Sequence, residues 1–283
     1  IEGITLKEGD FISLNGTTGE VYKGKVETKA AEVSGDFAAL MDLCNKYTKL
    51  NVRTNADTPH DAEVARAFGA SGIGLCRTEH MFFDAEKIVA MREMILSPDV
   101  EGRRKALAKL LPYQKADFKG IFKAMDGCPV NVRLLDPPLH EFVPHDAKGQ
   151  EEMAKAMGVT VQEIKKRVES LCEHNPMLGH RGCRLGNTYP EITEMQTQAI
   201  LGAAIELKKE GYDPHPEIMV PLTGILYEFE AQEKVIRDAA AALFEKEGME
   251  IPFKVGTMIE IPRAALTANR IASRAEYFSF GTN

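Results

Sequence analysis

Charged side chains that suit anion binding close two apolar runs of this 283-residue chain. The run Gly72–Cys76 leads into Arg77, and the run Pro129–Val132 leads into Arg133. A guanidinium offers five N–H donors in a rigid fork, which matches a phosphate or a carboxylate. A second interpretation stays open, in which each arginine is an ion-paired residue at a rim, for example Arg133 with Asp136. Two arginines at equivalent strand ends favour the anion site.

A carboxylate closes a third apolar run, because Glu260 stands near the end of Val255–Ile261 and Pro262 terminates that run. Glu260 is either a counter-ion of the arginines or a ligand of a hard cation such as Mg²⁺, which takes one or two carboxylates together with substrate oxygens. Without further context the counter-ion interpretation is favoured. The residues Gly281–Asn283 could present backbone N–H groups to an anion.

The elements that would position these side chains alternate between short apolar runs and amphipathic helices. Seven runs are predicted as strands: Leu50–Thr54, Gly72–Cys76, Pro129–Leu135, Met177–Leu185, Glu217–Leu222, Lys254–Ile261 and Glu276–Phe280. Alternating strands and helices predict an α/β fold with a parallel sheet. Polar residues at the C-terminal ends of several strands favour a closed (β/α)8 TIM-type barrel over an open sheet. Seven strands where eight are needed predict a barrel truncated before its last strand.

Helix ends are also marked in the sequence. Thr58 followed by Pro59 predicts a helix start, and Thr160 with Glu163 predicts a capping box. Pro190 opens a long helix that we expect to end at Gly211.

The N-terminal residues have a different pattern. Phe11–Leu14 and Glu20–Tyr22 flank a turn that contains two glycines, which predicts a β-hairpin. A polar stretch follows, and Phe37–Lys46 is predicted as a short helix. We therefore expect three parts: the end of a preceding domain at 1–27, a linker at 28–48 and a barrel domain at 49–283.

Composition narrows the functional classes. The chain is 44% hydrophobic and 27% charged, as globular domains are, and no run approaches the ~20 apolar residues of a membrane-spanning helix. The net charge of −7 argues against nucleic-acid binding. Five cysteines without a C-x-x-C pair argue against a disulfide framework or a structural zinc site. Free thiols and the missing leader predict a cytoplasmic protein, although organelle targeting stays open.

Four longer stretches resemble the phosphoenolpyruvate-utilising enzyme family. They are Gly74–Phe83, Arg133–Phe142, Gly179–Arg184 and Glu260–Arg263. The Arg-Thr-Glu element at 77–79 is shared across the family, whereas His80–Phe83 and Pro137–His140 favour the branch that uses inorganic phosphate. The resemblance implies a barrel that binds phosphoenolpyruvate and pyruvate. It implies a parent phosphotransferase that interconverts ATP, pyruvate and phosphate with AMP, phosphoenolpyruvate and diphosphate.

The resemblance also implies roles for single residues. Arg77 and Arg133 would bind the substrate phosphate, and Glu260 would hold Mg²⁺ and contact the substrate. Residues expected to line the remainder of the pocket are Gly281, Thr282 and Asn283 at the carboxylate and enolate end, with Asp136 and Arg181 as further candidates. With the resemblance, the metal-ligand interpretation of Glu260 outweighs the counter-ion interpretation.

The family's phosphocarrier histidine and the cysteine that protonates the enolate would lie outside this chain. None of its own residues is therefore assigned a catalytic role, and the isolated chain is expected to be inactive. ATP and phosphate would bind to other domains, and residues 1–27 resemble the end of a swivelling phosphohistidine domain. Family members associate through the barrel, which implies a homodimer.

Two alternatives stay open at this point. The first is a relative in the same family that uses water in place of phosphate. The second is a non-catalytic barrel used for dimerisation or regulation.

Overall fold

The computed structural model describes residues 3, 5–28, 33–173, 175 and 178–281. The chain divides into two compact units, Ile1–Thr48 and Lys49–Asn283. In the first unit, β1 (Ile12–Asn15) pairs antiparallel with β2 (Glu20–Lys23), and α1 spans Gly35–Tyr47. The side chain of Asn15 accepts the N–H of Thr17 at 3.1 Å and so stabilises the turn. The predicted hairpin and the predicted short helix are both confirmed.

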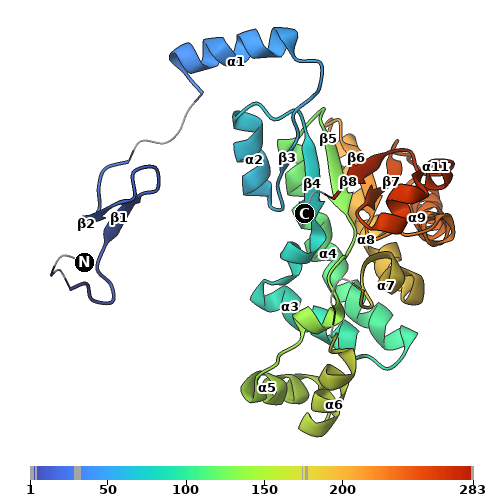
Figure 1. Ribbon diagram of the computed structural model, residues 1–283. Helices are drawn as coiled ribbons and strands as arrows, with labels where there is room; N and C mark the ends of the chain where they lie inside the picture. Colours follow the sequence, from blue (N-terminus) through green and yellow to red (C-terminus); the bar gives the residue numbers. More distant parts are fainter. Residues whose placement is uncertain (1–2, 4, 29–32, 174, 176–177, 282–283) are drawn as a thin grey trace. The chain divides into compact units, whose positions relative to one another are not determined.

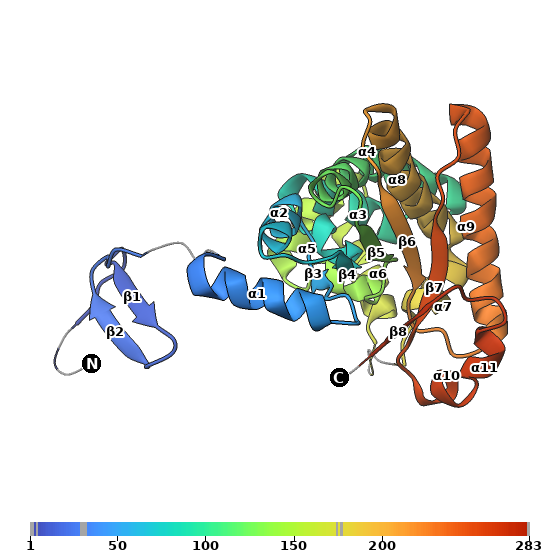
Figure 2. The same ribbon diagram turned by 90° about the horizontal axis from the view of Figure 1, so that it is seen from above.

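The second unit is built on a parallel sheet whose strands follow one another in chain order (Figure 1). Its strands are β3 (Thr54–Asn55), β4 (Ile73–Arg77), β5 (Pro129–Arg133), β6 (His215–Val220), β7 (Lys254–Ile259) and β8 (Phe278–Phe280). Figure 2 shows this sheet curling into part of a barrel, with helices packed on its outside. The α/β class and the TIM-type architecture are therefore confirmed.

The helices begin and end close to the predicted signals. Their bounds are α2 (Pro59–Ala67), η1 (Thr78–Phe82), α3 (Ala85–Leu96), α4 (Val100–Ala124), η2 (Leu139–Phe142), α5 (Ala147–Met157), α6 (Val161–Leu171), α7 (Gly182–Thr188), α8 (Pro190–Lys209), α9 (Leu226–Glu247), α10 (Pro262–Leu266) and α11 (Ala268–Ile271). The Thr58 hydroxyl accepts the N–H of Asp61, and Thr160 and Glu163 form the reciprocal capping box. Gly211, with φ +94°, follows the end of α8.

Two apolar cores hold the unit together. The first lies between the sheet and helices such as α4 and α8, and it contains Val132, Phe118 and Ile205, all essentially inaccessible to solvent. The second lies beneath the segment that connects β5 with α8, and it contains Phe142 and Ile164. Leu135 and Leu139, which follow β5, also belong to this core, so packing against neighbouring helices anchors the loop after β5.

Polar bridges cross the inside of the curled sheet. The Tyr277 hydroxyl, next to β8, donates to the amide oxygen of Asn131 on β5 at 2.9 Å. Arg53, just before β3, pairs with Glu217 on β6 at 2.6 Å. Burial raises the pKa of the Tyr277 hydroxyl well above its usual value, so this group stays protonated and donates. These contacts join strands that are not neighbours and support the curvature of the sheet.

The predicted strand Met177–Leu185 is wrong. Met177 lies outside the described residues, and the next residues form a turn and bends that lead into α7 at Gly182. The segment lacks an alternation of apolar residues, and Gly182 adopts φ +57°, which a strand does not use. The described part of the second unit therefore has six strands, and Arg181 precedes a helix instead of lying on a strand.

Gly256 on β7 generates a prediction about the packing of β8. A Cβ there would lie 2.6 Å from the backbone oxygen and ring carbons of Tyr277, so Gly256→Ala forces β8 away from β7. Overpacking of this kind costs about 1–3 kcal/mol. We expect faster amide hydrogen exchange in Phe278–Phe280, measured by mass spectrometry. Gly16→Ala, where a Cβ meets open space, is the control, and unchanged exchange in β8 of the Gly256 variant would contradict the packing argument.

Candidate functional site

The two predicted arginines lie side by side at the C-terminal edge of the sheet. Arg77 is the last residue of β4 and Arg133 the last residue of β5, and the strand register pairs them directly. Glu260 follows β7, and Gly281 follows β8. The parallel strands therefore bring these four residues to one edge of the sheet, where barrel sites lie.

Arg133 is held between two buried carboxylates. Its Nη2 donates to Glu79 from η1, and its Nη1 lies 3.0 Å from Asp136 Oδ2. The side chains of Arg133, Glu79 and Asp136 are only 11%, 7% and 4% exposed. The ion pair between Arg133 and Asp136 that the sequence suggested is therefore present. The contacts with Glu79 and Asp136 also fix the Arg133 guanidinium in one orientation.

Asp136 joins this arrangement to α7. Its Oδ2 accepts from Arg181 Nη2 at 2.8 Å, and its backbone oxygen accepts the N–H of Gly182 at 3.0 Å. Arg181 therefore reaches the site from the N-terminal end of α7. Glu79, Arg133, Asp136 and Arg181 form a chain of alternating charges, which we call the strand-end ion chain.

Several atoms of the strand-end ion chain lack a partner. Within the described residues, Glu79 Oε2, Arg133 Nε and Asp136 Oδ1 are buried and form no hydrogen bond. A buried polar atom without a partner costs about 1–3 kcal/mol, and native proteins satisfy nearly all such atoms with ligand, water or protein groups. A bound polar ligand or ordered water would complete this site.

Arg77 is held differently from Arg133. Its backbone N–H donates to Asp57 Oδ1 at 2.6 Å, and its guanidinium lies 3.8 Å from Asp57 Oδ2. The same Oδ2 is 2.6 Å from Nδ1 of His80. Because 3.8 Å is too long for a hydrogen bond, the ion pair leaves the donors of the Arg77 guanidinium available. The Arg77 side chain is 34% exposed and can meet a ligand.

Glu260 lies beside the strand-end ion chain. The N–H of Leu222 donates to its Oε1 at 2.8 Å. Burial raises the pKa of Glu260, the Leu222 N–H lowers it, and Asp136 raises it further, while Arg133 and Arg181 lower it. Burial has the largest effect on this pKa, so the ionised carboxylate is disfavoured unless a positive charge lies close to it.

The backbone around Glu260 is shaped for close approach. Leu222 adopts φ +58°, a conformation that costs a branched residue of this kind about 1–3 kcal/mol. That conformation presents its N–H to Glu260. A Cβ on Gly281 would lie 2.8 Å from Cβ of Glu260, and a Cβ on Gly182 would lie 2.9 Å from Cβ of Leu222, so both positions need glycine. Thr282 and Asn283 lie outside the described residues.

The donors near Glu260 fit a magnesium ion. Glu260 Oε2 has no hydrogen-bond or ion-pair partner in the part of the chain that the structure describes, and Asp136 Oδ1 is a second buried oxygen. The described part of the chain contains no group of three or more His, Cys, Asp or Glu side chains suited to holding a metal ion. One or two carboxylates with substrate oxygens is the donor set of Mg²⁺, not that of a structural zinc site.

The cysteines give no reactive thiol at this edge. The Cys183 thiol donates to the backbone oxygen of Leu222 at 3.2 Å, and burial raises its pKa to about 12. Burial also raises the pKa of Cys76 well above its usual value. Both thiols stay protonated at neutral pH, which makes them poor nucleophiles.

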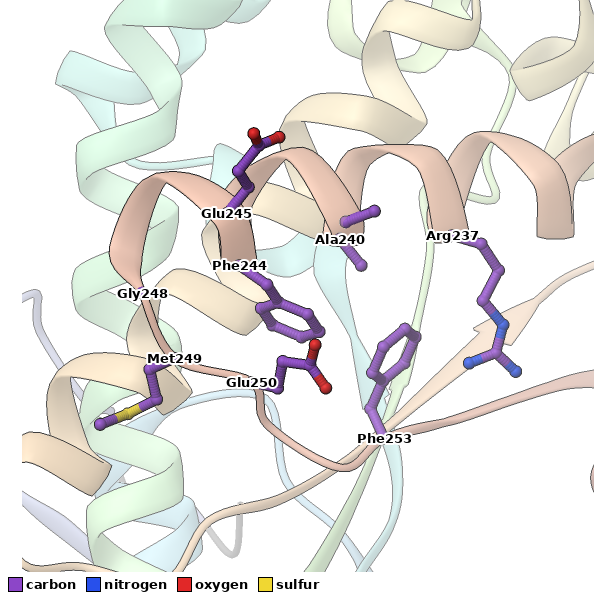
Figure 3. Close-up of a pocket in the computed structure, with 9 residues that line it drawn as sticks. Arg237, Ala240, Phe244, Glu245, Gly248, Met249, Glu250 and Phe253 are labelled. Atoms are coloured by element: carbon purple, nitrogen blue, oxygen red, sulfur yellow. The ribbon is translucent and has the colours of Figure 1, made fainter.

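A hollow of about 480 Å³ lies away from these residues (Figure 3). It is formed by the C-terminal half of α9 and by Phe253, which precedes β7 at the opposite edge of the sheet. Arg237 in this hollow is paired with Glu276 at 2.6 Å and lies over the Phe253 ring. The strand-end residues contribute nothing to it, so it is not the candidate site.

Sequence patterns missed the two carboxylates that hold the arginines, Asp57 and Glu79. A signal was present in both cases. Asp57 follows the predicted strand Leu50–Thr54, and Glu79 belongs to the Arg-Thr-Glu element. A charged residue shortly after one predicted strand could have been considered as a partner for the arginine at the end of the next strand.

A family model described as "PEP-utilising enzyme, PEP-binding domain" matches residues 31–283. The chain belongs to the phosphoenolpyruvate-utilising enzyme family. Proteins named pyruvate, phosphate dikinase from Clostridium symbiosum and Giardia intestinalis are 56% and 57% identical to it over 99% and 98% of its length. A chloroplastic pyruvate, phosphate dikinase of Oryza sativa is 54% identical over the whole chain. The chain spans 32%, 31% and 30% of these relatives.

None of the helices in the described residues combines the length and the apolar character that a membrane crossing needs.

The raised pKa of Glu260 predicts a pH-dependent gain in stability for Glu260→Gln. A raised pKa means that the folded protein favours the protonated carboxyl, so ionised Glu260 destabilises the fold at neutral pH. The neutral amide removes this cost. We expect the variant to unfold at a higher temperature than the wild type at neutral pH. This difference in unfolding temperature is expected to shrink as the pH falls towards 4.5, the ordinary pKa of a glutamate carboxyl. A difference independent of pH would contradict the prediction.

Proposed function

We propose that this chain forms the phosphoenolpyruvate- and pyruvate-binding part of a phosphotransferase. The parent protein interconverts ATP, pyruvate and phosphate with AMP, phosphoenolpyruvate and diphosphate. The observation that carries the proposal is the meeting of Arg77, Arg133 and Glu260 at one strand edge. The identity of 50–57% with proteins named pyruvate, phosphate dikinase supports the same reaction.

The two arginines bind the phosphoryl oxygens of phosphoenolpyruvate. Arg77 supplies the exposed guanidinium, and Arg133 supplies a guanidinium whose orientation is already fixed by Glu79 and Asp136. Donors that are in place before the reaction stabilise the charge on a transferring phosphoryl group without further reorganisation. Arg181, bound to the same Asp136, adds a third positive charge near the pocket.

Glu260 holds the metal end of the pocket. Its Oε1 is fixed by the Leu222 N–H, which leaves Oε2 for a cation. When bound there, Mg²⁺ supplies a Lewis acid that stabilises the enolate form of pyruvate. Gly281, packed against Glu260, lets the backbone after β8 approach the carboxylate and enolate end of the substrate. Thr282 and Asn283 are proposed to continue that wall, and Asp136 contributes by holding Arg133 and Arg181.

Other parts of the reaction belong to other domains. Residues 1–27 are proposed as the end of a swivelling phosphohistidine domain, 28–48 as a linker and 49–283 as the substrate-binding domain. The phosphocarrier histidine, the proton donor to the enolate and the sites for ATP and phosphate lie outside this chain. We also propose that the parent protein forms a homodimer through the barrel and that it is cytoplasmic. The plant relatives, in contrast, are named chloroplastic.

Phosphate dependence separates this reaction from its nearest rival. The complete gene product is expected to form phosphoenolpyruvate from ATP and pyruvate only when inorganic phosphate is present, with diphosphate as a product. Formation with water alone, with phosphate and AMP as products, would favour the alternative in the same family. A folded protein inactive under both conditions would favour a barrel used for dimerisation or regulation.

Arg77→Ala is the sharper test of the phosphate end. We expect kcat in the complete gene product to fall by about 10²–10³, as when one preorganised donor is removed from an active site. Arg77 is chosen because its loss leaves Asp57 still bonded to His80, whereas loss of Arg133 would leave two buried carboxylates without their shared partner. Arg104→Ala, an exposed arginine on α4, is the matched control. A decrease of equal size in both variants would contradict the assignment.

A further inference from the structure

One carboxylate, Asp57, contacts three groups around the end of β4. Its Oδ1 accepts the backbone N–H of Arg77, and its Oδ2 contacts both the Arg77 guanidinium and the His80 ring. Asp57 is itself well fixed, because it is largely buried and the next residue, Thr58, caps α2. These contacts join the loop after β3 to the residue that ends β4.

We propose that Asp57 is the positioning residue of Arg77 and that His80 fixes the orientation of the Asp57 carboxylate. The inference rests on the proposed function, in which Arg77 binds the substrate phosphate. An arginine side chain that is one-third exposed has many rotamers, and ordering it on ligand binding costs conformational entropy. Asp57 restricts the backbone of Arg77 through one oxygen and its guanidinium through the other.

The distance between Asp57 and the Arg77 guanidinium suits a carboxylate that orients this side chain better than one that occupies its N–H donors. At 3.8 Å the guanidinium is attracted to Asp57 without donating a hydrogen bond to it, and it donates none to any other described residue. Arg133, in contrast, donates directly to Glu79. Arg77 is therefore oriented while its N–H donors stay available for phosphoryl oxygens.

His80 completes the arrangement from η1. Its Nδ1 lies 2.6 Å from Asp57 Oδ2, so Nδ1 carries the proton and donates to the carboxylate. This bond holds the second oxygen of Asp57 away from full contact with the guanidinium. His80 contacts Arg77 through Asp57, which makes it a positioning residue as well.

A double-mutant cycle tests the inference in the complete gene product. With Mg²⁺ present, Asp57→Asn is expected to raise the dissociation constant of phosphoenolpyruvate about tenfold, since the amide loses the charge and one acceptor. In the Arg77→Ala background the same change is expected to have an effect within about twofold, because Asp57 acts through Arg77. Oxalate, which has no phosphoryl group, is expected to bind both Asp57 forms within about twofold.

Asp61→Asn is the matched control, since Asp61 is an exposed carboxylate on the first turn of α2 without an ion pair among the described residues. Thermal unfolding is measured for each variant. If Asp57→Asn is unfolded at the assay temperature, His80→Ala takes its place in the cycle, with a smaller Arg77-dependent loss expected.

The outcomes separate this inference from the proposed function. A wild-type protein that binds no phosphoenolpyruvate overturns the proposed function and the inference with it. A wild-type protein that binds, together with an Asp57 variant that binds equally well, overturns the inference alone. Equal weakening of phosphoenolpyruvate and oxalate, or an undiminished effect in the Arg77→Ala background, also overturns it, because either result indicates a general loosening of the fold.

Discussion

The pairing of strand-end arginines with carboxylates from neighbouring loops is the interaction on which the site depends. Asp57 after β3 contacts Arg77 on β4, Glu79 after β4 contacts Arg133 on β5, and Asp136 after β5 contacts both Arg133 and Arg181. Breaking a buried pair by removing one partner costs about 3–5 kcal/mol, because the remaining charge has lost its compensation. Arg133, whose carboxylate partners are buried with it, is therefore fixed by the fold before any ligand arrives.

The remainder of the edge is organised around Glu260 at some expense of stability. Leu222 is held at φ +58° while its N–H bonds the carboxylate, and burial opposes the ionisation of Glu260. Strain and unfavourable ionisation tend to gather where a protein binds or transforms a ligand. The parallel sheet makes this possible, since it brings the ends of β4, β5, β7 and β8 to one edge without requiring them to be close in sequence.

Local patterns in the sequence were enough to predict the hairpin, most strands, the helix caps and the positions of Arg77, Arg133 and Glu260 at strand ends. The strand at 177–185 was mistaken because a polar, glycine-containing segment carries little periodicity, and its conformation depends on contacts of Gly182 with Asp136 and Leu222. The partners Asp57 and Glu79 were missed because they lie 20 and 54 residues from the arginine groups they contact, and these contacts depend on which strands are neighbours in the sheet. The roles of Thr282 and Asn283 stay predictions.

The central claim is that this strand edge binds the enolate form of pyruvate through a metal held by Glu260. Calorimetric titration of oxalate, a planar dianion that resembles the enolate, tests it most directly when run on the complete gene product with and without Mg²⁺. The account predicts binding that requires Mg²⁺ in the wild type and is lost in Glu260→Gln, while Glu230→Gln, a change at an exposed carboxylate on α9, binds like the wild type. Binding that is independent of Mg²⁺, or that survives in Glu260→Gln, would contradict it.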